Sequence, residues 1–265
     1  MLIGGLQKSS MIDYPEKISA IIFTQGCNFR CPYCHNPELI NNFGSCRNNI
    51  ISSETKNVLN PASHINKHEN EIPNMTYNIK TKQFMFRDDV LNFLKSRVGK
   101  LDGVVITGGE PTLQKGLEGF IREIKDLGFL VKLDTNGTNP DILQRLLDEN
   151  LIDYIAMDIK SPIEKYNEIV CANVEVESIL KSIELVKNSN LGYEFRTTVV
   201  KSQLTLEDFE KIGGMLSGAE KYYLQKFIPT KTLDENFMTQ ATYSDEEFAD
   251  IILLIKKYVE NVEVR

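Results

Sequence analysis

The sequence predicts an α/β fold in which parallel strands alternate with helices. Short apolar runs rich in β-branched residues alternate with segments of helical spacing along most of the chain. The apolar runs are nearly continuous, as expected for parallel strands that are covered on both faces. Six strand–helix units form either an open doubly wound sheet or an incomplete barrel, and both place ligands at the carboxyl ends of the strands.

Each element of the first half has its own local signal. ISAIIFT (18–24) is apolar and β-branched, and DDVLNFLKSRV (88–98) has the spacing of an amphipathic helix that leads into the strand DGVVIT (102–107). GLEGFIREIKDLG (116–128) has helical spacing and a terminal glycine, and it precedes the strand FLVKLDT (129–135).

The second half of the chain continues this alternation. Its last helix is expected to begin after Ser244, a residue type that caps helix N-termini. The expected helices are 140–150, 176–188, 206–216 and 244–260, and the expected strands are 154–159, 193–200 and 221–228.

Residues 1–265 are expected to form a single domain with one insertion, at about 41–83. This segment is rich in Asn, Lys and Ser and has no sustained period, which favours a mobile insertion over a functional lid. His64 and His68 are four residues apart and could share a helix face as metal ligands. Because no carboxylate or thiol stands at matching spacing, surface histidines are the preferred interpretation.

Composition excludes several functional classes. The net charge is −7 and acids and bases are interspersed, so neither nucleic acid nor an anionic membrane is expected as a partner. We find no signal peptide and no apolar run long enough to span a membrane, and we expect a cytoplasmic protein. The five cysteines, clustered mainly at one place, favour metal binding over a disulfide framework.

Polar residues recur where successive predicted strands end. Any one of them could belong to an ordinary turn or ion pair, but parallel strands would bring them all to one edge of the sheet. The positions concerned are Gln25–Cys27, Thr107–Pro111, Asp134–Gly137, Asp158–Lys160, Arg196 within its strand, and Gln225–Phe227.

Cys27, Cys31 and Cys34 fall within eight positions after the first of these strands. A structural zinc ion needs four ligands, and His35 could be the fourth, but adjacent Cys34 and His35 would struggle to reach one tetrahedral ion. An iron–sulfur cube takes one thiolate per iron, so three cysteines leave one iron open to a small chelating ligand. Cys46 and Cys171 are expected to be ordinary thiols.

The motif CNFRCPYC resembles the cysteine loop of radical S-adenosylmethionine (SAM) enzymes. Together with DYPEK, ITGGEPTLQ, LDTNGT and MDIK it resembles the glycyl-radical-enzyme activases, in particular the longer form of the activating protein of anaerobic ribonucleoside-triphosphate reductase. The resemblance implies a (β/α)6 partial TIM barrel with parallel strands, which agrees with the six predicted strands.

The resemblance also implies roles for individual residues. Cys27, Cys31 and Cys34 would hold a [4Fe–4S] cluster, and Tyr33 would lie against the adenine of S-adenosylmethionine. The remaining implied roles are Gly108, Gly109 and Glu110 at the methionyl amino group, Asp134, Thr135 and Asp158 around the ligand and a monovalent cation, Lys160 and Arg196 near the ligand carboxylate, and Asp13 on the substrate side. Gln225, at the end of the sixth strand, is also expected on the substrate side.

The implied function is that of an oxidoreductase. It would cleave S-adenosylmethionine reductively and use the 5′-deoxyadenosyl radical to form a glycyl radical on a partner, anaerobic ribonucleotide reductase, with flavodoxin or ferredoxin as electron donor. One alternative is a radical SAM enzyme that acts on another peptide or on a small molecule. The other is a non-catalytic zinc-binding protein. Visible absorption distinguishes the two kinds of site, because a zinc-loaded protein is colourless and an iron–sulfur protein is brown.

Overall fold

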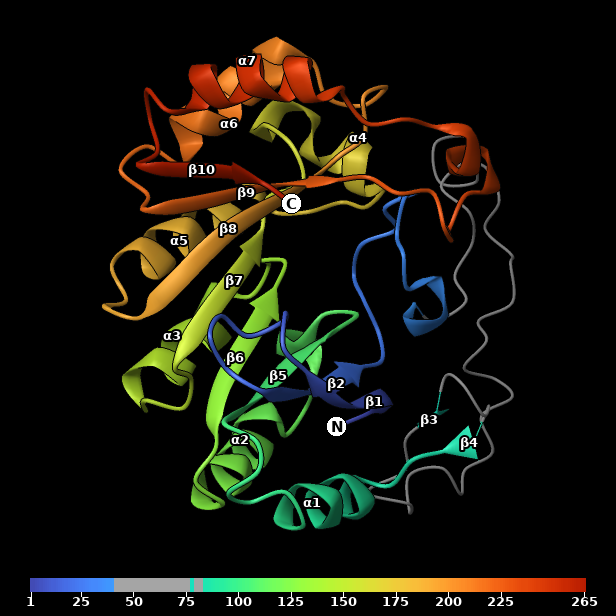
Figure 1. The fold of residues 1–265 in the computed structure, drawn as a ribbon, viewed down its shortest axis with the longest axis vertical. Coiled ribbons are helices and arrows are strands. Elements are labelled where there is room, and N and C mark those ends of the chain that lie inside the picture. Colours follow the sequence, from blue (N-terminus) through green and yellow to red (C-terminus); the bar gives the residue numbers. More distant parts are fainter. Residues whose placement is uncertain (41–76, 79–82) are drawn as a thin grey trace.

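The computed structural model describes residues 1–40, 77–78 and 83–265. In this part of the chain one eight-stranded sheet has the order β1-β2-β5-β6-β7-β8-β9-β10. All neighbouring pairs are parallel except β1 and β2. Figure 1 shows this sheet curving from β1 to β10 with the helices along its outer side. The predicted α/β fold is confirmed.

The six predicted strands are all present in the predicted order. Since each strand after the first pairs in parallel with the one before it among these six, their carboxyl ends lie at the same edge of the sheet. They are β2 (Ser19–Thr24), β5 (Gly103–Gly108), β6 (Leu130–Thr135), β7 (Tyr154–Asp158), β8 (Gly192–Val199) and β9 (Lys221–Lys226).

The sheet has two strands that the sequence did not predict. β1 (Ile3–Ser10) pairs with β2 in antiparallel fashion, and its two glycines and polar residues give it no clear strand pattern. β10 (Asn261–Val264) pairs in parallel with β9. The prediction of a last helix over 244–260 is wrong at its end, because α7 (Asp245–Ile255) stops earlier and the chain returns to the sheet.

The predicted helices are present and cover the outer face of the sheet. Ser244 caps α7 through a capping box with Glu247, which confirms its predicted role. A short helix, α4 (Tyr166–Val170), was not predicted. The others are α1 (Arg87–Lys95), α2 (Leu117–Asp126), α3 (Pro140–Asp148), α5 (Val176–Lys187) and α6 (Leu206–Met215).

The two faces of the sheet differ in chemistry, since successive strand residues point to opposite sides. Ile22, Ile106 and Leu133 belong to the large apolar core that includes helix residues such as Phe120. The other face carries a small apolar cluster near the amino ends of the strands, formed by Tyr14, Ile21, Val105 and Tyr154. Beyond this cluster, towards the carboxyl ends, the same face carries charged side chains.

Only a small part of the predicted insertion lies among the described residues. Residues 77–78 and 83 of this segment are described: β3 (Tyr77–Asn78) pairs in antiparallel register with β4 (Gln83–Phe84), which ends just beyond it. Cys46, His64 and His68 lie outside the described residues, so the expectations about them stay predictions. Among the helices of the described residues, none has the length and apolar character needed to cross a membrane.

Candidate functional site

The carboxyl ends of the parallel strands border a cavity of about 220 Å³. Its wall combines the cysteine loop after β2 with the ends of β5, β6 and β7, as the recurrence of polar residues at strand ends predicts. The lining includes Cys27, Phe29, Cys31, Tyr33, Cys34, His35, Thr107, Gly108, Gly109, Glu110, Asp134, Thr135, Asn136, Asp158, Lys160 and Thr198.

The three cysteines of the loop are free thiols that face this cavity. Burial raises the pKa of Cys27 to about 12 and that of Cys31 to about 11, and it also raises the pKa of Cys34. In the metal-free protein these thiols therefore carry their protons at neutral pH. Metal binding must displace the protons, since the thiolate is the ligand.

The arrangement of the thiols fits a cluster better than a single ion. Among the described residues, no three His, Cys, Asp or Glu side chains surround a point where one metal ion could sit. A zinc ion needs such convergence, whereas a cube with one thiolate per iron needs its cysteines spread around a cavity. His35, the candidate fourth zinc ligand, packs its ring 5.6 Å from that of Phe227.

Gly108 and Gly109 bring the end of β5 against the cysteine loop. Gly108 has φ +119°, and an added Cβ on it would lie 2.9 Å from the carbonyl carbon of Phe23. An added Cβ on Gly109 would lie 2.6 Å from the carbonyl carbon of Gly26 and closer still to its oxygen. The Glu110 amide then donates to the Gly26 carbonyl at 2.8 Å. Glycine is needed at both positions because backbone approaches backbone.

Glu110 is a buried carboxylate held by hydrogen-bond donors. Oε1 accepts from the Thr112 amide (3.1 Å), the Thr112 hydroxyl (2.5 Å) and the Thr135 hydroxyl (2.8 Å), and Oε2 accepts from the Asn136 amide (2.6 Å). Burial raises its pKa, and these donors oppose the rise. No ion pair among the described residues includes Glu110. The site therefore holds a carboxylate without a cationic partner at the cavity wall.

A row of alternating charges crosses the sheet beside Glu110. Lys132 lies 2.8 Å from Asp134, and Arg196 bridges Asp134 (3.2 Å) and Asp158 (2.9 Å). Lys160 completes the row at 3.0 Å from Asp158. Both carboxylates are thus already paired with cations, and a monovalent cation at this place stays a prediction.

The pKa shifts of Asp158 and Lys160 keep both side chains ionised. Burial alone would raise the pKa of Asp158, but Arg196 and Lys160 bring it down to about 2. Burial would lower the pKa of Lys160, but Asp158 raises it well above its ordinary value. Lys160 therefore stays protonated at the cavity wall.

Most of the predicted site residues meet at the cavity, and three do not line it. Arg196 lies behind the wall and contacts the cavity residues Asp134 and Asp158. Gln225 stands opposite the lining residue Thr198 in the β8–β9 register. Asp13 accepts a hydrogen bond from Ser10, which pairs with Ser19 at the start of β2.

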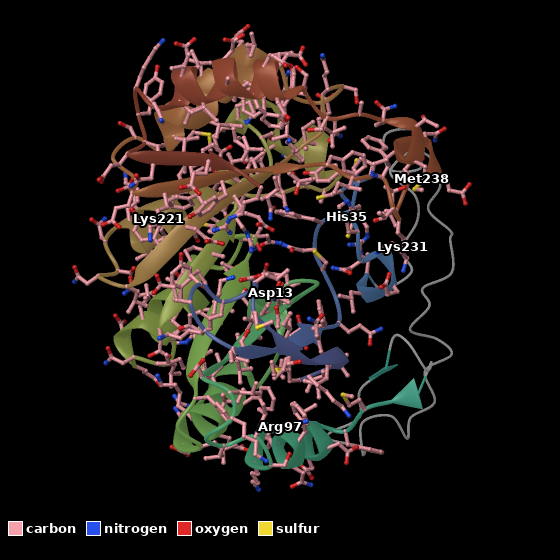
Figure 2. The ribbon with its side chains drawn as sticks, in the orientation of Figure 1. Asp13, His35, Arg97, Lys221, Lys231 and Met238 are labelled. Carbon is pink, nitrogen blue, oxygen red and sulfur yellow. The ribbon has the colours of Figure 1, made fainter. Side chains whose placement is uncertain are left out.

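Asp13 therefore lies near the opposite end of β2 from the cysteine loop. Figure 2 labels Asp13 together with His35 of that loop. The substrate-side roles of Asp13 and Gln225 stay predictions.

The sequence analysis assigned no role to several residues at or near the site. Asn136 lines the cavity, and its side chain forms hydrogen bonds with Asn28 and Thr138, which do not line it. A signal was available, since Asn28 lies between two cysteines and Asn136 follows Thr135 at a strand end. Cys171 does not line the cavity.

Comparisons with known proteins agree with this site. The model of the radical SAM superfamily matches residues 21–216. A protein of Methanocaldococcus jannaschii named "Putative glycyl-radical enzyme activating enzyme" is 34% identical over 269 residues, which cover 100% of this chain and 95% of the relative. A second protein with the same descriptive name from that organism is 28% identical over 225 residues, covering 84% of this chain and 71% of the relative.

Solved structures share the fold at low sequence identity. A domain of pyruvate-formate lyase-activating enzyme from Bacteroides vulgatus has a TM-score of 0.50 at 18% identity, covering 62% of this chain and 98% of that domain. Streptococcus suis SuiB bound to S-adenosylmethionine has a TM-score of 0.56 at 12% identity, covering 90% of this chain and 48% of SuiB. These likenesses show the partial-barrel fold alone. The family match, which spans the cysteine loop and strands β5 to β8, shows that this chain belongs to the radical SAM superfamily.

Proposed function

We propose that this chain is a glycyl-radical-enzyme activase and that its partner is anaerobic ribonucleoside-triphosphate reductase. The printed description of the 34%-identical relative supports the activase class. The partner rests on the resemblance of the cysteine loop and strand-end motifs. One observation carries the proposal: three free thiols and a buried, cation-free Glu110 face the same cavity.

Membership of the family implies a [4Fe–4S] cluster and S-adenosylmethionine as cofactors. Cys27, Cys31 and Cys34 would hold the cluster, because they are free thiols spread around one cavity. When bound and supplied with one electron by an external reductant, the two cofactors would provide the radical chemistry that removes a hydrogen atom from the Cα of a glycine. The chain's own residues bind, orient and shield the ligand.

Glu110 is suited to bind the ammonium group of the ligand. Its two oxygens are fixed by four donors, so the carboxylate does not have to reorganise when a cation arrives. The buried charge lacks a counter-charge, and an ammonium would provide one.

The charged row is suited to bind the ligand carboxylate. Asp134 and Asp158 are each paired with two cations of the row, and Arg196 also lies 3.9 Å from Glu194. Lys160 lines the cavity and is held protonated, so it presents a positive charge there. Glu110, for the ammonium group, and Lys160, for the carboxylate, therefore line the same cavity, and an amino acid ligand needs both.

Tyr33 lines the cavity and is suited to exclude water from it. Its side chain is buried, and its ring centroid lies 6.4 Å from that of Phe237 in the segment after β9. The Asp234 amide of that segment donates to the Pro32 carbonyl at 2.9 Å, which fixes the segment beside the cysteine loop. An adenine ring packed against Tyr33 would be shielded from solvent.

The proposal is tested with anaerobically reconstituted protein. Iron per chain, 5′-deoxyadenosine after reduction with dithionite, and the electron paramagnetic resonance (EPR) signal of a glycyl radical on the added reductase are measured. Cys31→Ala should lose iron and all later steps, whereas the matched control Cys171→Ala, at a cysteine that does not line the cavity, should keep iron. Wild-type protein that makes 5′-deoxyadenosine but never a glycyl radical would refute the activase role and favour another substrate.

A further inference from the structure

A closed ring of side-chain hydrogen bonds links the cysteine loop to the loop after β6. The Asn136 Nδ2 donates to Asn28 Oδ1 at 2.8 Å, Asn28 Nδ2 donates to Thr138 Oγ1 at 2.9 Å, and Thr138 Oγ1 donates to Asn136 Oδ1 at 2.7 Å. Asn28 lies between the proposed cluster ligands Cys27 and Cys31. Of the three residues in the ring, Asn136 lines the cavity, whereas Asn28 and Thr138 are not among its lining residues.

The direction of every bond in this ring follows from one backbone donor. The Thr138 amide donates to Asn136 Oδ1 at 3.1 Å, and an N–H group can only donate. The side-chain amide of Asn136 must therefore point its nitrogen at Asn28, and Asn28 must accept this hydrogen bond through its Oδ1 atom. The nitrogen of Asn28 then faces the Thr138 hydroxyl, which accepts from it and donates to Asn136. Each polar group in the ring has one possible role.

The ring joins the cysteine loop to the residues that fix Glu110. The backbone amide of Asn136 donates to Glu110 at 2.6 Å, and the preceding residue Thr135 donates its hydroxyl to the same carboxylate. Asn136 thus holds Glu110 through its backbone and Asn28 through its side chain. A shift of one partner is transmitted to the other through a residue that is only 5% exposed.

We infer that Asn28 is a positioning residue that sets the distance between the cysteine loop and Glu110. This inference rests on the proposed function, because it needs one ligand that spans the cluster and the Glu110 carboxylate. The Glu110 amide also bonds to Gly26, so loss of the ring loosens the spacing without releasing the loop. Asn28 should therefore act on ligand affinity and leave the cluster in place.

The test compares Asn28→Ala and Thr138→Val, which each break the ring, with Thr138→Ser, which keeps the hydroxyl. Iron per chain and the dissociation constant for S-adenosylmethionine are measured on reconstituted protein, together with the change that the ligand causes in the EPR spectrum of the reduced cluster. Asn188→Ala is the control, since its side chain bonds to the Glu184 carbonyl at the end of α5.

We expect full iron in all variants and about tenfold weaker binding in Asn28→Ala and Thr138→Val, the loss of one to two net hydrogen bonds. Thr138→Ser and Asn188→Ala should bind as the wild type does, and the double variant should be no weaker than Asn28→Ala. Unchanged affinity in Thr138→Val and Asn28→Ala, or loss of iron, would overturn the inference. Wild-type protein that holds iron but binds no S-adenosylmethionine would instead refute the proposed function.

Discussion

Gly109→Ala should destabilise the protein and detach the cysteine loop from its site, although it adds a single methyl group. The added Cβ would lie 2.6 Å from the carbonyl carbon of Gly26, whereas carbon atoms in contact are about 3.5–4.0 Å apart. Backbone must therefore move by about 1 Å. Overpacking of this kind costs about 1–3 kcal/mol in the free energy of unfolding.

Gly119→Ala is the matched control. Gly119 lies in α2, and an added Cβ there would meet no atom within 4 Å. Alanine is favoured over glycine in a helix by about 0.5–1 kcal/mol, so this variant should be slightly more stable than the wild type. The same substitution is thus expected to lower the free energy of unfolding at Gly109 and to raise it at Gly119.

The assay combines anaerobic thermal unfolding with iron analysis. For a chain of this length, about 2 °C of melting temperature corresponds to 1 kcal/mol, so Gly109→Ala should melt about 2–6 °C lower. Because Gly26 is bonded to Cys27, the shift should also reduce iron per chain and S-adenosylmethionine binding. A Gly109→Ala protein with wild-type melting temperature, iron content and affinity would show that the close approach of the two backbones is not required.

Three further outcomes are expected. Burial raises the pKa of Glu110, and only its ionised form pairs with an ammonium group. The affinity for S-adenosylmethionine should therefore fall as pH is lowered through that raised pKa. The Glu110→Gln variant should lose this part of the pH dependence and bind the ligand weakly at every pH. Ser244→Ala should lower the free energy of unfolding by about 1 kcal/mol in urea titrations, and no change would contradict the capping role. Lys231→Ala should change stability by less than about 1 kcal/mol, because the pair with Glu38 is partly exposed; a larger loss would mean that this pair holds the cysteine loop.

The sequence predicted the strands and the site well because both depend on local patterns and one topological rule. The β-branched runs mark the six strands, and parallel pairing then requires their carboxyl ends to meet. Glu110, Thr135 and Lys160 are far apart in the chain, yet each follows or ends a strand, so the rule alone places them at one cavity. The cysteine loop enters the same cavity because it follows the first of these strands.

The remaining elements depend on contacts that a local pattern does not contain. β10 is four residues long and is stable only as a neighbour of β9. Lys256–Tyr258 continue the helical composition of α7, but the Tyr258 carbonyl accepts from the Gly218 amide and the Glu260 amide donates to the Ala219 carbonyl. These long-range bonds turn the chain back to the sheet. The ring at Asn28 was missed for the same reason, since its members lie more than 100 residues apart.

On the inner face of the sheet, the side chains change along β5 and β7 from apolar packing residues to polar residues that line the cavity. On β5 the inward residues change from Val105 in the apolar cluster to Thr107 at the cavity, and on β7 they change from Tyr154 to Asp158. Both changes occur within four residues, from the end that fills the barrel to the end that borders the cavity. A packed core would not contain Lys132, Asp134 and Arg196, because buried charges cost stability unless they are paired. Mutual pairing limits what the charged row costs the fold, and the proposed binding of the ligand carboxylate gives a reason for its place at the cavity.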